Sequence, residues 1–86
     1  MKISVELTLT PLQDDFETPI KEFIKELRAS EFTVLENPLS TQVYGEYAEV
    51  MPFLTALIQA TFKQLDHVLV NMKLVKSDRS TYEPDF

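Results

Sequence analysis

The sequence predicts an α+β domain in which two amphipathic helices cover one face of a four-stranded antiparallel sheet. Three observations support this fold class. Residues 3–10 and 67–76 alternate between polar and apolar side chains, as half-buried strands do. Two other segments repeat apolar residues at helical spacing. Between these two segments lie two short extended runs, separated by Asn37-Pro38.

The most regular element is the first strand, residues 3–10, which follows a strict period of two and contains β-branched residues. Its polar side is expected to lie on an open face of an antiparallel sheet. The two sides are Ile3, Val5, Leu7 and Leu9, and Ser4, Glu6, Thr8 and Thr10.

The first helix is expected soon after Pro11, which ends the strand. Asp14 and Asp15 can cap it, and Thr18-Pro19 offers a second start with proline at the first helical position. The expected buried stripe consists of Ile20, Phe23, Ile24 and Leu27.

The middle of the chain is expected to form a hairpin that leads directly into the second helix. Residues 32–36 and 40–46 are its strands, and Asn37-Pro38 breaks the chain between them. The helix should begin near Tyr47 or Ala48, and it tolerates Pro52 only within its first turn. Its expected buried face consists of Val50, Phe53, Leu54, Leu57, Ile58 and Phe62.

The resulting element order, β-α-β-β-α-β, predicts a ferredoxin-like sandwich with both helices on one face. Residues 1–79 are expected to form a single domain, and residues 80–86 a polar C-terminal tail. The first strand is then central, between the third and the fourth. The helix-free face should carry Ser4, Glu6, Thr8, Gln42, Tyr44, Asn71 and Lys73. This face could be solvated, with a surface Glu6–Lys73 pair, or it could pack on another subunit around a polar pocket.

Composition excludes several classes of function. The 86 residues contain no cysteine and one histidine, so thiolate chemistry and a histidine metal cluster are not expected. A net charge of −6 argues against nucleic-acid binding. No signal peptide or membrane span is evident, so a cytoplasmic protein without a membrane partner is expected. No nucleophile–base pair is present; His67 is expected to be structural, and the chain to be a binding protein rather than an enzyme.

One run of the sequence, NPLSTQVYGEYAEVM at residues 37–51, carries a family resemblance. It follows the opening strand ISVELTLTPL and precedes a last strand that runs into Asp78-Arg79. Together these features resemble the small thiamine-binding proteins, which are related to the YkoF pyrimidine-binding proteins. The resemblance extends from Ile3 to Arg79. Its most specific part is the pattern Thr-x-Val-x-Gly-Glu-x-x-Glu-Val-Met from Thr41 to Met51.

The resemblance implies a ferredoxin-like protein that forms dimers or homotetramers and binds thiamine or hydroxymethylpyrimidine without catalysing a reaction. No cofactor or metal is implied. By position, Thr41, Gly45 and Glu46 match the family's threonine, glycine and acid. Other matches are Ser4 in the first strand, Pro11 at its end, Arg79 beyond the last strand, and Lys73 or Lys76 for the family lysine. Departures from the family pattern are Ser40 for glycine, Tyr44 for glutamate and Ala48 for a capping aspartate.

The expected ligand-binding residues are Ser4, Glu6, Asn37, Ser40, Thr41, Tyr44 and Glu46. Glu6 or Glu46 would pair with the amino edge of an aminopyrimidine, and an acidic, aromatic surround suits the cationic thiazolium. Asn37, Ser40 and Thr41 would add neutral hydrogen bonds, and Tyr44 would stack on a ring. Gly45 would allow close backbone approach or a positive φ.

Structural alternatives stay open for these residues. Ser40 and Thr41 are also typical turn residues, Glu46 could favour the second helix's N-terminal dipole, and Tyr44 could lie in a subunit interface.

Two functions therefore follow from the sequence. The first is a cytoplasmic homo-oligomer that binds thiamine or its hydroxymethylpyrimidine half as a carrier or sensor. The alternative is a structural or interaction protein whose sheet face only makes oligomer contacts.

Overall fold

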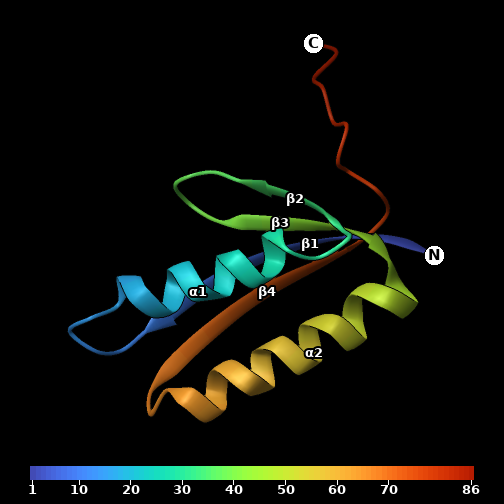
Figure 1. Cartoon of the computed structure of the whole chain (residues 1–86). Helices are drawn as coiled ribbons and strands as arrows, with labels where there is room; N and C mark the ends of the chain where they lie inside the picture. Colours follow the sequence, from blue (N-terminus) through green and yellow to red (C-terminus); the bar gives the residue numbers. More distant parts are fainter.

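The computed structural model describes residues 1–86 and confirms the predicted element order (Figure 1). All four strands and both helices lie within a few residues of their expected positions. The elements are β1 (Lys2–Pro11), α1 (Glu17–Arg28), β2 (Thr33–Glu36), β3 (Thr41–Glu46), α2 (Tyr47–Gln64) and β4 (Val68–Lys76).

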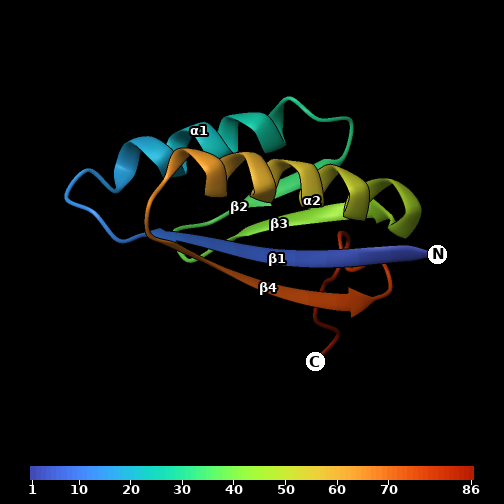
Figure 2. The same ribbon diagram turned by 90° about the horizontal axis from the view of Figure 1, so that it is seen from below.

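The four strands form one antiparallel sheet in the order β2-β3-β1-β4, with both helices on the same side (Figure 2). β1 is central, as expected, and pairs Val5 with Val43 on one side and with Leu74 on the other. This register places every second residue of each strand on the helix side. The remaining residues form the open face, which no helix covers.

The core lies between the sheet and the helices, and it contains the apolar side of β1. Phe23 and Leu27 of α1 and Val50 and Leu54 of α2 pack onto this layer, because the apolar stripes of both helices face the sheet. The buried apolar residues are Ile3, Val5, Leu7, Phe23, Leu27, Val43, Val50 and Leu54.

Three details of the helices differ from the sequence expectation. α1 begins at Glu17, so Pro19 is its third residue rather than its first; the Thr18 N–H does bind the Asp15 carboxylate (3.3 Å). Pro52 is the sixth residue of α2 and lies in the second turn, not the first. A proline there cannot bond the Ala48 carbonyl, but both residues are exposed, so water can satisfy that group.

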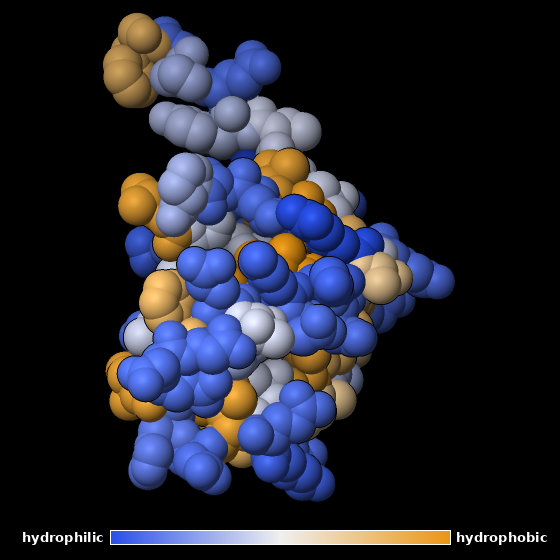
Figure 3. Space-filling model, turned by 60° about the vertical axis from the view of Figure 1, so that its left-hand side comes forward, coloured by the Kyte–Doolittle hydropathy of each residue, from blue (hydrophilic) through white to orange (hydrophobic).

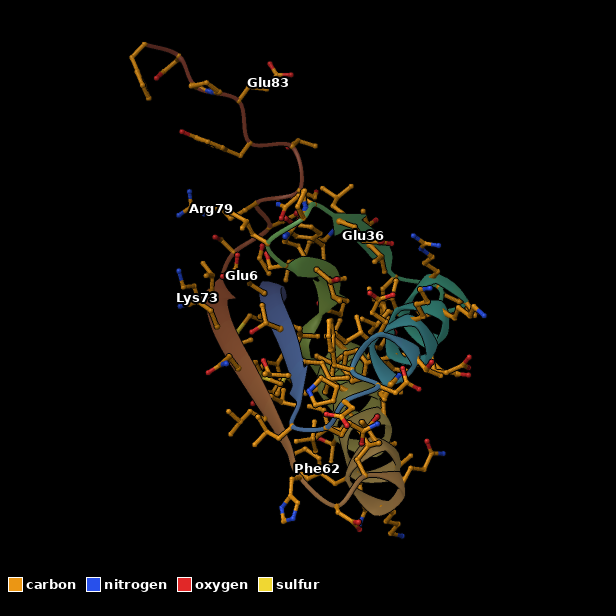
Figure 4. The ribbon with its side chains drawn as sticks, turned by 90° about the vertical axis from the view of Figure 1, so that its left-hand side faces the viewer. Glu6, Glu36, Phe62, Lys73, Arg79 and Glu83 are labelled. Atoms are coloured by element: carbon orange, nitrogen blue, oxygen red, sulfur yellow. The ribbon has the colours of Figure 1, made fainter.

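Phe62 is the third difference, because it was expected in the core but is half exposed. It lies near the end of α2, close to where β4 begins (Figure 4). Neither helix is long and apolar enough to cross a membrane.

Gly45 has a packing role rather than a conformational one. Its φ is not positive, which contradicts one of its two expected roles. It lies on the helix side of β3, where an added Cβ would be 2.9 Å from Val50 Cγ2 and 3.0 Å from Phe32 Cδ1. Glycine therefore lets the start of α2 and Phe32 pack directly against the β3 backbone.

Candidate ligand-binding site

The seven predicted site residues fall on two sides of the sheet. Four of them lie on the open face: Ser4 and Glu6 of β1, and Tyr44 and Glu46 of β3. Along each strand they alternate with the residues that face the helices. Thr41 pairs with Leu7 and therefore lies on the helix side. The other two, Asn37 and Ser40, belong to the β2–β3 turn.

Ser40 connects the turn to the open face. Its hydroxyl donates to the Glu6 carboxylate (2.9 Å) and accepts a hydrogen bond from the Gln42 side-chain amide (2.7 Å). Glu6 therefore has a neutral partner, and no ion pair joins it to Lys73, its neighbour across β1 and β4 (Figure 4). The chain Gln42–Ser40–Glu6 leaves carboxylate oxygens available on the open face.

Ser4 serves a structural purpose in this structure. Its side chain is only 7% exposed, although no helix covers it. Its hydroxyl donates to the Ser77 carbonyl (2.7 Å) and accepts the Arg79 N–H (2.8 Å), so the segment after β4 folds over it. The predicted polar character of the open face is right, but Ser4 holds the C-terminal segment rather than facing open solvent.

Tyr44 lies beside Ser4 on β3 and is partly buried. Burial raises the pKa of its phenol above the usual value, and the negative charges of Asp78 and Glu6 raise it further. Its side chain therefore lies partly buried on the open face, near the carboxylates of Asp78 and Glu6.

Glu46 is bound at the end of β3 by the chain's own N-terminus. Its carboxylate accepts a hydrogen bond from the Met1 ammonium (2.9 Å), and this partner holds the pKa of Glu46 below its usual value. The carboxylate is partly exposed and lies away from Thr41, at the opposite end of the same strand.

A hollow of about 460 Å³ lies on the helix side, under the β2–β3 turn and beside α1. It brings together Asn37, Ser40 and Thr41, three of the seven predicted residues. The rest of its wall is mainly apolar. The walls include Leu7 and Leu9 of β1, Ile20, Phe23 and Ile24 of α1, and Pro38 and Leu39 of the turn.

Thr41 is the most informative residue of this hollow. The residue as a whole is only 7% exposed and lines the hollow, and its hydroxyl, whose oxygen is not fully buried, makes no hydrogen bond within the chain. Asn37 differs, because its Oδ1 already accepts the N–H groups of Leu39 (2.8 Å) and Ser40 (3.0 Å). The turn therefore uses the carbonyl end of Asn37 and leaves its Nδ2 amide without a partner in the chain.

Sequence reasoning missed the apolar walls of this hollow. Ile20, Phe23 and Ile24 were assigned to the buried stripe of α1, and that assignment is right for Phe23, which is buried. Their position beside the turn depends on how α1 crosses the sheet. The sequence did contain a signal that Thr41 lies on the helix side. Because side chains alternate along β3, Thr41 shares a face with the apolar Val43, and Tyr44 lies on the other face.

Two other hollows contain few of the predicted residues. A groove of about 650 Å³ runs between α1 and α2 and contains none of them; its rim carries Asp15, Glu22 and Glu26. A shallow depression of about 220 Å³ on the open face is lined by Glu6, Thr8, Asn71, Met72 and Lys73. No three His, Asp or Glu side chains lie close enough together to hold a metal ion.

Comparison with known proteins adds a family and a set of similar structures. The sequence model of the family described as "Thiamine-binding protein" matches residues 5–83. No curated protein matches the chain. A Streptococcus pneumoniae protein of known structure is 28% identical, with a TM-score of 0.83 over 94% of this chain and 92% of that one.

Two more distant structures share the fold. A candidate thiamine biosynthesis/salvage protein of Thermotoga maritima is 18% identical, with a TM-score of 0.81 over 90% of this chain and 85% of that one. A hypothetical protein of Methanocaldococcus jannascii is 18% identical, with a TM-score of 0.75 over 90% and 81%.

Proposed function

Because the chain belongs to the thiamine-binding protein family, we propose that it binds thiamine or hydroxymethylpyrimidine as a non-enzymatic carrier or sensor. We place the heterocycle in the hollow under the β2–β3 turn and propose that the protein works in the cytoplasm as a homo-oligomer. The observation that carries the assignment of the site is the Thr41 hydroxyl, which belongs to a largely buried residue, lines a hollow, and has no hydrogen-bond partner in the chain although its oxygen is not fully buried.

The walls of the hollow suit an aromatic heterocycle. Small-molecule sites are mostly apolar with a few placed polar groups, and their volumes start at about 300 Å³. Here Phe23 and Ile24 would contact the faces of a pyrimidine ring, while the Thr41 hydroxyl and the free Asn37 amide would bind its polar edge. The Thr41 hydroxyl can bind such a ligand without breaking a hydrogen bond within the protein, because it makes none there and keeps some contact with solvent.

The open face would take part through Ser40, which lines the hollow and also binds Glu6. Thiamine carries a cationic thiazolium beside its pyrimidine. We propose that this cation would lie toward the Glu6 carboxylate, because opposite charges attract and the chain as a whole is acidic. Hydroxymethylpyrimidine lacks the cation and would depend on the hollow alone.

The alternative function is an interaction protein without a small ligand, whose sheet only makes subunit contacts. The exposed apolar side chains of β4, Leu69, Met72 and Leu74, support this alternative. It predicts assembly without any response to thiamine.

Calorimetric titration tests the proposal. We expect heat on titration of the wild-type protein with thiamine and with hydroxymethylpyrimidine. In the Thr41→Val variant, which keeps the shape but removes the hydroxyl, affinity should fall about tenfold, the equivalent of one hydrogen bond. Stability without ligand should stay the same or rise, because the native hydroxyl is unpaired. Thr33→Val is the matched control, since Thr33 is an exposed strand threonine away from the hollow.

Each result decides between the candidates. Loss of affinity in Thr41→Val but not in Thr33→Val supports the site. Full affinity in Thr41→Val would move the ligand elsewhere on the protein. The absence of heat with either compound, at millimolar concentration, would favour the interaction protein.

A further inference from the structure

The surface of α2 is more apolar than its packing on the sheet requires. Between Glu49 and Lys63 the helix carries no charged side chain. Only Val50 and Leu54 of this stretch are buried. A helix on the surface of a domain usually turns a charged face to solvent, and a large apolar surface outside the core often marks a site of interaction. The uncharged surface of α2 outside the core therefore needs an explanation beyond the fold.

Part of this uncharged surface forms one wall of the groove of about 650 Å³ between α1 and α2. Ala56 and Ala60 leave the room for the groove on the α2 side, because both are exposed and neither side chain extends beyond Cβ. An α-helix rises about 1.5 Å per residue, so the wall from Phe53 to Gln64 runs for about 17 Å. The groove is therefore long enough for about three turns of another helix.

The apolar floor of the groove is held in place by the core. Phe23 is buried, and Leu57 packs against the core residues. Phe53 packs edge to face on Phe32, with ring centroids 5.4 Å apart. The Thr61 hydroxyl on the same wall already donates to the Leu57 carbonyl (2.9 Å). The groove thus offers mainly preformed apolar contact, which lowers the ordering cost of binding.

The charged residues of the groove are all acidic. Asp15, Glu22 and Glu26 line it, and all three are exposed. The basic residues of α1 lie outside the lining. Glu22 makes one exposed ion pair, with Lys25 (3.7 Å), and such pairs are worth little; Asp15 and Glu26 make none. The rim of the groove therefore carries negative charge that is free to attract a cationic partner.

Apolar walls with an acidic rim complement an amphipathic helix that has a basic face. The apolar stripe of such a helix would lie between α1 and α2. Its lysine or arginine side chains would reach Glu22 and Glu26, which lie one turn apart on the same side of α1. The net charge of −6 attracts the same partner at longer range.

Other large partners fit this charge pattern less well. The acidic rim would repel the anionic surface of a membrane. A second copy of the chain carries the same net charge of −6. In that copy α1 is the helix with several basic residues, but its apolar residues Phe23 and Leu27 are already buried in the core.

We propose that the groove between α1 and α2 binds a basic amphipathic helix of another protein. The partner would contribute about three turns, with apolar residues at helical spacing and lysine or arginine beside them. Such binding is independent of the proposed ligand site, because none of the seven predicted ligand-binding residues lines the groove. The groove and the hollow under the β2–β3 turn share only Phe23, which is left unchanged in the tests.

Fluorescence anisotropy with synthetic peptides tests the chemistry of the partner. The probe is a labelled peptide of about fourteen residues, with leucines along one helical face and lysines beside them. We expect it to bind the wild-type protein with a Kd between about 1 and 100 μM. Two control peptides should bind at least tenfold more weakly. In one, glutamate replaces every lysine; in the other, the same residues are reordered so that the leucines surround the helix.

Substitutions in the protein test the location of the binding surface. Ala60→Lys places a long cationic side chain in the groove and should raise the Kd of the basic peptide at least tenfold. Ala48→Lys is its matched control, because Ala48 is an exposed alanine of α2 outside the groove. Glu26→Lys should raise the Kd at least about threefold. Glu83→Lys makes the same change of charge in the C-terminal tail (Figure 4) and should have little effect.

Circular dichroism confirms that each variant is folded, and the remaining outcomes decide the proposal. Failure of the basic peptide to bind, equal binding of a control peptide, or equal effects of the groove and control substitutions would overturn it. Displacement of the peptide by millimolar thiamine would assign the groove to thiamine instead. A change in the sedimentation coefficient of Ala60→Lys without peptide would assign it to a second copy. An absence of heat with thiamine leaves the peptide results intact, so the two proposals fail separately.

Discussion

Replacement of Gly45 by alanine gives a test in which the sign of the effect is informative. Where the backbone of glycine is compatible with other residues and space exists, Gly→Ala usually stabilises by about 0.4–1 kcal/mol, through the unfolded state. Gly45 has no positive φ, so backbone conformation alone predicts this gain. The structure predicts the opposite, because the new methyl group would be 2.9 Å from Val50 Cγ2 and 3.0 Å from Phe32 Cδ1.

The expected size follows from these contacts. Val50 is fully buried and its β-branched side chain has little rotamer freedom, so the start of α2 must shift to admit the methyl group. Overpacking of this kind costs about 1–3 kcal/mol. After the gain from the unfolded state, the net destabilisation should be about 0.5–2 kcal/mol, and each kcal/mol lowers the melting temperature by about 4–8 °C in a domain of this size.

Urea unfolding followed by circular dichroism measures the effect, and Val50→Ala identifies its cause. Val50→Ala should be destabilising alone, because it opens a cavity. In the Gly45→Ala background, Val50→Ala should lower the free energy of unfolding less than it does in the wild type, by at least about 0.5 kcal/mol. The reason is that Val50→Ala removes the methyl group that the new side chain at position 45 would contact. A Gly45→Ala protein as stable as wild type or more stable, or strict additivity of the two changes, would refute this reasoning.

Three further predictions concern the open face and its edges. Ser4→Ala should speed hydrogen exchange at the Arg79 amide, which loses its acceptor, well beyond any change at core amides of β1. Because the pKa of Tyr44 is raised in the fold, its stabilising contribution is complete below about pH 10 and is lost as pH rises through the folded pKa; Tyr44→Phe should flatten this alkaline loss in thermal melts. Because the pKa of Glu46 is lowered, its contribution is present above about pH 4.5 and is lost as pH falls through the folded pKa. Glu46→Gln should flatten the acid limb of the same melts, and an unchanged limb would contradict the Met1 contact.

Local pattern was sufficient to predict the sheet. Strict alternation over residues 3–10 fixed which side of β1 is apolar, and the pairing of Val5 with Val43 and Leu74 confirms the central position of that strand. The same periodicity separates Thr41 from Tyr44, so the division of the predicted site into two sides was also present in the sequence. The prediction of a single site did not take this alternation into account.

What sequence could not provide depends on contacts between distant segments. Ser4 is buried by residues 77–79, more than seventy positions away, and no local pattern signals that fold-back. Phe62 fits the helical stripe of α2, but the sheet ends at β4 and leaves it half covered. The tail after residue 80 stands clear of the body in Figure 3, where the surface is mainly hydrophilic with separate apolar patches. The position of this tail relative to the domain also cannot be predicted from a local sequence pattern.

The central claim is that a small heterocycle binds under the β2–β3 turn, against the unpaired hydroxyl of Thr41. A crystal structure of the protein grown with hydroxymethylpyrimidine tests it most directly. We expect the ring between the turn and α1, with a polar ring atom within hydrogen-bond distance of Thr41 Oγ1. A ring bound on the open face or in the groove between the two helices, with the hollow under the turn empty, would contradict the claim.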